Sequence, residues 1–124
     1  MNTQPELSDA ELKRLACLET WNAAVAAVTF VADDGRGYTF VTAQFLDGLH
    51  ECHSASEPNA PRERLVLRFT TGDAVVLGSR LDRIEEGMAA GCLRRVKTIH
   101  PRHAGALKTG PVILSITINR KDEP

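Results

Sequence analysis

Two short turn sequences constrain the fold of this chain more than any other feature, because each is flanked by runs with strand character. The first is Asp-Asp-Gly-Arg-Gly at 33–37 and the second is Thr-Gly-Asp at 71–73. Glycine turns of this kind between β-branched or aromatic runs are a strong short-range signal for a β-hairpin. The four flanking runs cover 25–32, 38–46, 64–69 and 74–77. The sequence therefore predicts two hairpins and a mostly antiparallel sheet.

The C-terminal third adds two further strands to this prediction. Residues 112–119 alternate between two sets of side chains with the cleanest period of two in the chain, which indicates a strand. Residues 93–99 form a basic run that we also interpret as a strand. Two segments, 50–61 and 101–110, contain proline and polar residues and are expected to be loops.

The first helix is expected near the N-terminus. Ser8 and Glu11 have the spacing of a capping box, and Leu7 and Leu12 have that of a hydrophobic staple. We expect this helix to end near residues 19–22, where β-branched residues become more frequent. A longer helix through residue 28 is the alternative, because the alanines there favour a helix.

The second helix is expected to begin at Ser79, a residue type that commonly caps helices. Asp82 then lies in the first turn, where the helix dipole favours an anion, and Gly91 is a suitable stop. The expected inner stripe consists of Leu81, Ile84, Met88 and the stem of Glu85. The Glu85–Glu86 pair is otherwise interpreted as part of a solvated face.

Together these elements predict an α+β fold: five or six mostly antiparallel strands built from hairpins, with two helices packed on the sheet. The chain has 124 residues, which fits one globular domain over residues 1–124. Short flexible polar termini are expected at about 1–6 and 119–124.

Composition excludes several classes of protein. The formal net charge of -1 argues against a strongly basic nucleic-acid binder. The longest uncharged stretch, 20–32, is far shorter than the ~20 apolar residues that cross a bilayer. Cys17, Cys52 and Cys92 are an odd number of widely spaced thiols, which is typical of a reducing compartment. We therefore expect a small soluble cytoplasmic protein that does not interact with membranes.

Two short histidine pairs are the candidate metal ligands. His50, Cys52 and His53 lie in one segment, and His100 and His103 lie in another. Zinc takes nitrogen and sulfur ligands in a tetrahedron, and two ligand pairs from separate segments can build such a site. On an extended strand His50 and Cys52 point to the same side. The alternatives are a zinc site at His50, Cys52, His100 and His103, or four surface histidines without a cofactor.

Charge is unevenly distributed along the chain. Residues 1–86 hold 14 acidic and 8 basic side chains, whereas residues 87–121 hold 7 basic and no acidic ones. A segment of one sign can bind an acidic protein surface or nucleic acid. Nucleic acid is the less favoured partner, because the basic segment contains no aromatic residue on which bases could stack. The candidate anion- or partner-binding residues are Arg94, Arg95, Lys97, Arg102 and Lys108.

Nothing in the sequence forms a recognisable catalytic constellation, so we expect a non-catalytic binding or assembly protein rather than an enzyme. The final strand, or the basic strand before it, is expected at a sheet edge. An exposed edge can pair with another chain, which makes a homodimer the favoured form. A metal-binding protein and a polyanion binder acting through residues 94–108 are the alternative functions.

Overall fold

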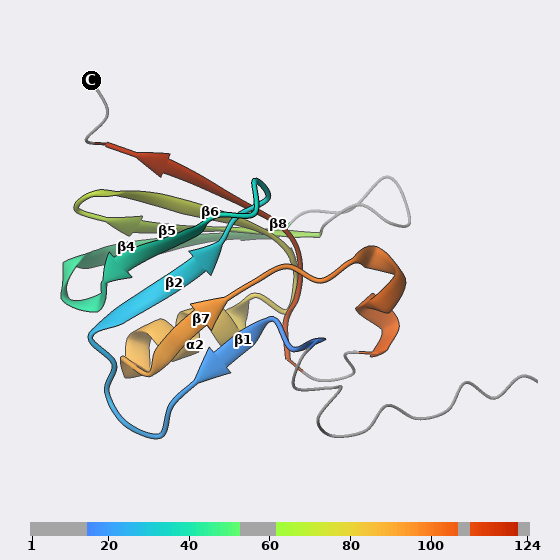
Figure 1. Ribbon diagram of the computed structural model, residues 1–124, viewed down its shortest axis with the longest axis horizontal. Helices are drawn as coiled ribbons and strands as arrows, with labels where there is room; N and C mark the ends of the chain where they lie inside the picture. The colour runs from blue at the N-terminus through green and yellow to red at the C-terminus, as the bar shows by residue number, and fades with distance from the viewer. Residues whose placement is uncertain (1–14, 53–61, 107–109, 122–124) are drawn as a thin grey trace, which may run out of the picture.

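The protein folds into two small β-sheets and a helix (Figure 1). This computed structural model describes residues 15–52, 62–106 and 110–121, which contain eight strands, one α-helix and two 3-10 segments. The strands are β1 (Leu18–Thr20), β2 (Ala27–Val31), β3 (Gly37–Val41), β4 (Phe45–Cys52), β5 (Glu63–Phe69), β6 (Gly72–Ser79), β7 (Leu93–Val96) and β8 (Val112–Arg120). The helix is α2 (Asp82–Ala90), and the 3-10 segments are η1 (Thr42–Gln44) and η2 (Pro101–Ala106). No helix in the described residues is long and apolar enough to cross a membrane.

Strands β4-β5-β6-β8, in that order, form sheet B, and all of its neighbours are antiparallel. The predicted hairpin around residues 71–73 is confirmed as β5 and β6. Side chains along β6 alternate strictly between buried and partly exposed, as a strand with one covered face requires. Sheet B therefore has an inner face that belongs to the core and an outer face that does not.

Strands β1-β7-β2-β3 form sheet A. The predicted hairpin around residues 33–37 is confirmed as β2 and β3, and Gly35 takes a left-handed φ of 82° in its turn. Strand β7 runs parallel to β2, whereas the other pairings are antiparallel. Two parallel strands cannot be joined by a tight turn and need a long connection. The chain between β2 and β7 is long, and α2 lies in it, between β6 and β7.

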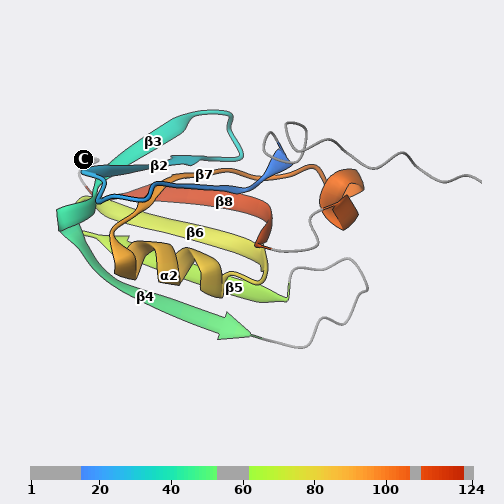
Figure 2. The same ribbon diagram turned by 90° about the horizontal axis from the view of Figure 1, so that it is seen from below.

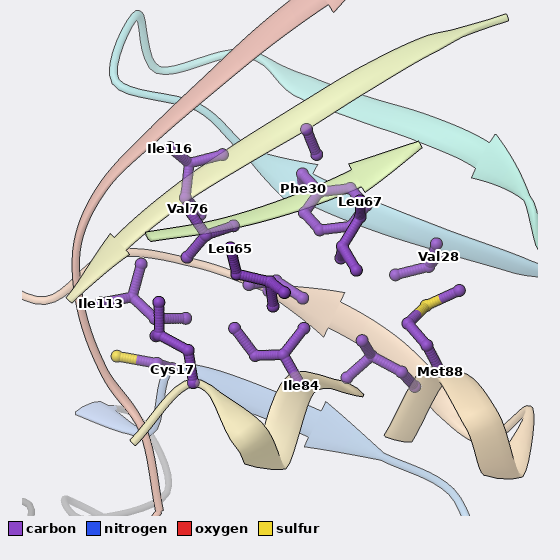
Figure 3. Packing of buried hydrophobic residues seen from close by; sticks show 14 of the residues in the cluster. Cys17, Val28, Phe30, Leu65, Leu67, Val76, Ile84, Met88, Ile113 and Ile116 are labelled. Atoms are coloured by element: carbon purple, nitrogen blue, oxygen red, sulfur yellow. The ribbon is translucent and has the colours of Figure 1, made fainter. Parts of the chain in front are cut away.

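The core lies between the two sheets and α2. Phe30 and Phe40 of sheet A meet Phe69 of sheet B, with the Phe40 and Phe69 rings stacked at a centroid distance of 4.5 Å. Ile84 and Met88 of α2 are buried and point into this core (Figure 3). Figure 2 shows α2 lying alongside β5 and β6, with β4 at the margin of sheet B. Of the predicted inner stripe, Leu81, Ile84 and Met88 are buried, with Leu81 at the N-cap, whereas the Glu85 side chain is 40% exposed.

Asp33 connects the two sheets at the edge of β8. Its backbone N–H donates to the carbonyl of Ile116, and its carboxylate accepts from the Ile116 N–H at 2.9 Å and from the Ser115 hydroxyl at 2.6 Å. Strand β8 is the sheet edge that the sequence predicted, but Asp33 already forms hydrogen bonds with part of this edge, at Ser115 and Ile116. The prediction for the basic strand was wrong, because β7 lies inside sheet A between β1 and β2.

The mostly antiparallel character is confirmed, but the number of elements was wrong. The structure has eight strands in two sheets and one α-helix in the part it describes, where five or six strands and two helices were expected. Most of the expected first helix lies outside the described residues. Its expected end near 19–22 and its longer alternative are both wrong, since β1 covers Leu18–Thr20 and β2 begins at Ala27.

Three boundaries also differ from the prediction. The return strand expected over 38–46 breaks at η1, and its second part begins β4, which runs to Cys52 through part of the expected loop. Ser79 is the last residue of β6 and does not cap α2, whose N-cap is Leu81 without a side-chain cap bond. Strand β8 continues through Arg120, so the first two residues of the expected polar tail, 119 and 120, belong to the strand.

Candidate metal centre

A cluster of side chains with metal-ligand chemistry lies where β4 and β5 meet the start of α2. His50 and Cys52 are two residues apart on β4, so they project from the same face. Glu63 lies directly opposite Cys52 in the antiparallel register, at the beginning of β5. The register partner of His50 is Leu65, which is fully buried. The three side chains therefore belong to the inner face of sheet B, at its margin.

The candidate ligand atoms of these residues converge. His50 Nε2 is 2.7 Å from Glu63 Oε1, and Cys52 Sγ is 3.8 Å from His50 Nε2. All three ligand atoms lie within 4.8 Å of one another, and no other such group of three or more is found in the described residues. Cys52 is exposed while His50 and Glu63 are largely covered. The cluster is thus held by two paired strands and is open on one side.

His50 also contacts the helix. Its Nδ1 lies 2.6 Å from Glu85 Oε1 in the first turn of α2. Both ring nitrogens therefore face carboxylate oxygens, which only accept hydrogen bonds when ionised. The two carboxylates thus fix the orientation of the His50 ring. Glu85 is a partner of His50, not a member of a purely solvated pair as the sequence suggested.

Glu63 is held by the backbone that leads into α2. Its Oε2 accepts from the Arg80 N–H at 2.5 Å, and its Oε1 accepts from the Leu81 N–H at 3.1 Å. Burial raises the pKa of the Glu63 carboxyl, but hydrogen bonds from Arg80, His50 and Leu81 outweigh it and hold that pKa below its usual value. The carboxylate therefore satisfies the N–H groups of the two residues that precede α2, and it does not cap the helix itself.

The donor set resembles a zinc site in its chemistry. Imidazole nitrogen, thiolate sulfur and carboxylate oxygen are the three ligand types that Zn²⁺ accepts. Mg²⁺ and Ca²⁺ prefer oxygen ligands throughout, and this group supplies one carboxylate. Glu85 would hold the second imidazole nitrogen, as carboxylates commonly do for histidine ligands.

The second histidine pair lies elsewhere. His100 precedes η2 and His103 lies within it, with their ring centroids 6.3 Å apart. The Arg102 backbone N–H donates to His100 Nδ1 at 3.2 Å, and Arg102 Nε donates to His103 Nε2 at 3.1 Å. The converging group contains neither histidine. The structure thus brings two of the four predicted ligands together and adds Glu63; His53 lies outside the described residues.

The predicted anion-binding residues are dispersed along β7 and η2. Arg94 pairs with Glu19 at 3.1 Å and stacks over the Trp21 ring at 4.6 Å. Arg95 is exposed and lies opposite Glu19 in the register of β1 and β7. Lys97 follows β7, Arg102 lies in η2, and Lys108 is outside the described residues.

A separate cavity of 570 Å³ lies on another side of α2. Cys17, Cys92 and Pro111 line it, together with Arg83 and Glu86 of the helix. Burial raises the pKa of the Cys17 thiol above its usual value, which favours the neutral, unreactive form. Cys17 is 2% exposed and belongs to the hydrophobic core.

Glu63 and Glu85 were the residues that sequence reasoning missed. Glu63 lies 13 positions from His50 and Glu85 lies 35 positions from it, so no local spacing links them. No family model matches the sequence, and no curated protein or solved structure matches it either. Function therefore has to be argued from the site itself.

Proposed function

We propose that this protein binds a transition-metal ion of the zinc class through His50, Cys52 and Glu63. The observation that carries the proposal is the convergence of nitrogen, sulfur and oxygen ligand atoms within 4.8 Å on two paired strands. A site on paired strands needs little reorganisation to accept an ion, which favours tight binding. The proposal concerns binding and assigns no reaction to the protein.

Loading the site is an exchange of protons for metal. His50 Nε2 and Cys52 Sγ would bind the ion in their deprotonated forms, as metal ligands do. Glu85 keeps its hydrogen bond to Nδ1–H and orients the ring. Protons compete with the ion for these ligand atoms, so binding weakens as the pH falls.

The distances support a modest adjustment on loading. Tetrahedral Zn²⁺ places N and O ligands about 3.3 Å apart and N and S ligands about 3.5 Å apart, from bond lengths of about 2.0–2.3 Å. The corresponding distances here are 2.7 Å from His50 Nε2 to Glu63 Oε1 and 3.8 Å from His50 Nε2 to Cys52 Sγ. The ion therefore enters by displacing the carboxylate from the ring by about half an ångström, with little movement of the strands.

The test is a metal titration of protein purified without an affinity tag. Zn²⁺ is titrated in competition with a chromophoric chelator, and Co²⁺ is titrated separately while thiolate-to-metal absorption is recorded. We expect one ion per chain, a thiolate band with Co²⁺, and loss of that band in Cys52→Ser together with at least about 10-fold weaker Zn²⁺ binding.

Two matched variants control this experiment. Glu51→Gln changes the β4 residue between the two ligands, whose side chain pairs with Arg64 at 3.7 Å on the other face. Cys92→Ser removes a thiol that lines the separate cavity. Both should bind Zn²⁺ like the wild type. The proposal fails if binding is not stoichiometric, if the Co²⁺ spectrum lacks a thiolate band, or if Cys92→Ser abolishes it.

A further inference from the structure

The outer face of sheet B carries an ordered pattern of side chains that the metal centre does not use. Three rows cross the four strands in register. The central row is Leu49, Val66, Val75 and Thr117. One flanking row is Asp47, Arg68, Asp73 and Asn119, and the other is Glu51, Arg64, Leu77 and Ser115. An apolar row thus lies between two rows that contain charges.

This face is accessible in the chain. Leu49 is 53% exposed, and Val66, Val75 and Leu77 are only partly buried. The buried residues of β5 and β6, such as Leu65 and Val76, point the opposite way, toward α2 and sheet A (Figure 3). A contiguous apolar stripe rimmed by polar residues is typical of an interaction surface.

The edge of sheet B is a poorer docking surface than its face. Strand β4 has an irregularity between Phe45 and Asp47, and its outward residues on either side of Leu49 are both acidic. Bulges and charges of this kind discourage strand addition. At the other edge, the Asp33 carboxylate already accepts a hydrogen bond from the Ile116 N–H of β8. A partner is therefore expected on the face.

Charge on the face selects the partner and its orientation. A two-fold axis parallel to the strands, between β5 and β6, brings Arg68 of one copy over Asp73 of the other and Val66 over Val75. The same axis places Asp47 near Asn119 and Lys121 of the second copy. An axis along the rows would instead place Arg68 over Arg64 and Asp47 over Glu51, where like charges repel. The face is thus complementary to itself in one orientation.

We propose that a second copy of this chain packs on the outer face of sheet B around the two-fold axis parallel to the strands. Asp73 supports this placement, because its side chain is 28% exposed and its ion pair with Lys121, its only one in the described residues, is long at 3.9 Å. Arg68 pairs with Asp47 and presents its charge beside Asp73. Two symmetric Arg68–Asp73 contacts then flank the apolar centre.

The size of the face indicates which class of interface the dimer would have. Four strands at about 4.8 Å spacing and seven residues at about 3.3 Å rise give a projected face of about 440 Å² on each copy. The total of about 900 Å² lies at the low end for specific interfaces, in the range of transient complexes. We therefore expect a dissociation constant of about 10–100 µM.

Sedimentation velocity over a concentration series tests the proposal, with EDTA present so that metal binding does not contribute. The wild type should pass from monomer to dimer within this range. Val75→Lys and Asp73→Lys should each raise the dissociation constant at least about 10-fold, because they place a charge in the apolar row or beside Arg68 of the second copy. Thr39→Lys, an exposed position on β3 of sheet A, is the matched control and should leave the constant unchanged.

Circular dichroism of each variant verifies that the fold is kept, which is expected because all three side chains point away from the core. The proposal is overturned if the wild type stays monomeric at about 200 µM, well above the expected constant. It is also overturned if the dimer survives both sheet B substitutions, or if Thr39→Lys dissociates it.

Discussion

Replacing Glu63 by glutamine should destabilise the metal-free protein out of proportion to the size of the change. The carboxylate accepts three hydrogen bonds: from the Arg80 N–H at 2.5 Å, from the Leu81 N–H at 3.1 Å and from His50 Nε2 at 2.7 Å. The glutamine side chain has the same shape but carries no charge. Its amide nitrogen is also a donor, so one of its two ends must face a donor of the protein.

The magnitude follows from those three bonds. A hydrogen bond to a charged group contributes about 1.5–3 kcal/mol to stability, whereas one between neutral groups contributes about 1 kcal/mol. Glutamine can retain one or two of the bonds in weaker form. We therefore expect Glu63→Gln to lower the free energy of unfolding by about 2–4 kcal/mol, with α2 still formed in the native state.

The effect should depend on pH in one direction. The pKa of Glu63 is held below its usual value in the folded chain, so the folded state favours the ionised form. Its contribution to stability is complete above the unfolded pKa of about 4.3 and is lost as the pH falls through the lower folded pKa. The difference between wild type and Glu63→Gln should therefore be constant near neutral pH and shrink below about pH 4.

Urea unfolding followed by far-ultraviolet circular dichroism, with EDTA present, measures this difference from neutral to acid pH. Glu86→Gln is the matched control: its side chain is 64% exposed and its contact with Arg83 is 3.8 Å, so a change of at most about 0.5 kcal/mol is expected. The reasoning is refuted if Glu63→Gln matches the wild type within that margin, or if the difference persists undiminished at acid pH.

Two further substitutions test the packing and the junction of the sheets by the same unfolding titration. In Gly78→Ala the new Cβ would lie 2.0 Å from a backbone oxygen of β8, so we expect the free energy of unfolding to fall by about 3 kcal/mol. Gly105→Ala is the control, because its Cβ would meet nothing within 4 Å, and its free energy of unfolding should change by no more than about 0.5 kcal/mol. Equal effects at the two glycines would contradict this. Asp33→Ala removes the bonds to the Ile116 N–H and the Ser115 hydroxyl and should cost about 1–3 kcal/mol; an unchanged midpoint would show that these bonds do not hold the sheets together.

Local chemistry accounts for the parts of the fold that could be predicted from the sequence. Both hairpins follow from their glycine turns, and the end of α2 follows from Gly91, whose φ of 69° suits glycine. The strand character of β8 follows from its alternation, but the register shift between Leu77 and Gly78 buries Ile113 together with Ile116, which strict alternation places on opposite faces. These signals lie within a few residues of the structures they produce.

The parts that were missed depend on distant partners. Strand β4 contains Gly48 and two acidic residues and has little strand character of its own, but it pairs with β5 along most of its length. Strand β1 has three residues and exists because it pairs with β7, more than 70 positions later. Tertiary pairing overrides local propensity in both cases.

The candidate site also contains residues that the sequence could place and residues that only the tertiary structure brings in. The two-residue spacing of His50 and Cys52 predicted that they share a face, and the structure places them 3.8 Å apart at His50 Nε2 and Cys52 Sγ. Glu63 joins them through the β4–β5 register, and Glu85 joins them through the docking of α2. A sequence pattern can place neighbours on one strand, whereas the remaining ligands depend on how the strands and helix assemble.

The proposed metal binding should leave the start of α2 unchanged. The Glu63 carboxylate accepts hydrogen bonds from the Arg80 and Leu81 N–H groups as well as contacting His50. The ion replaces the contact with His50 and leaves the two backbone hydrogen bonds in place. Loading should therefore stabilise the fold by the free energy of metal binding and leave the helix content unchanged. A change in far-ultraviolet circular dichroism on Zn²⁺ addition would show that the ion displaces Glu63 from the Arg80 and Leu81 N–H groups.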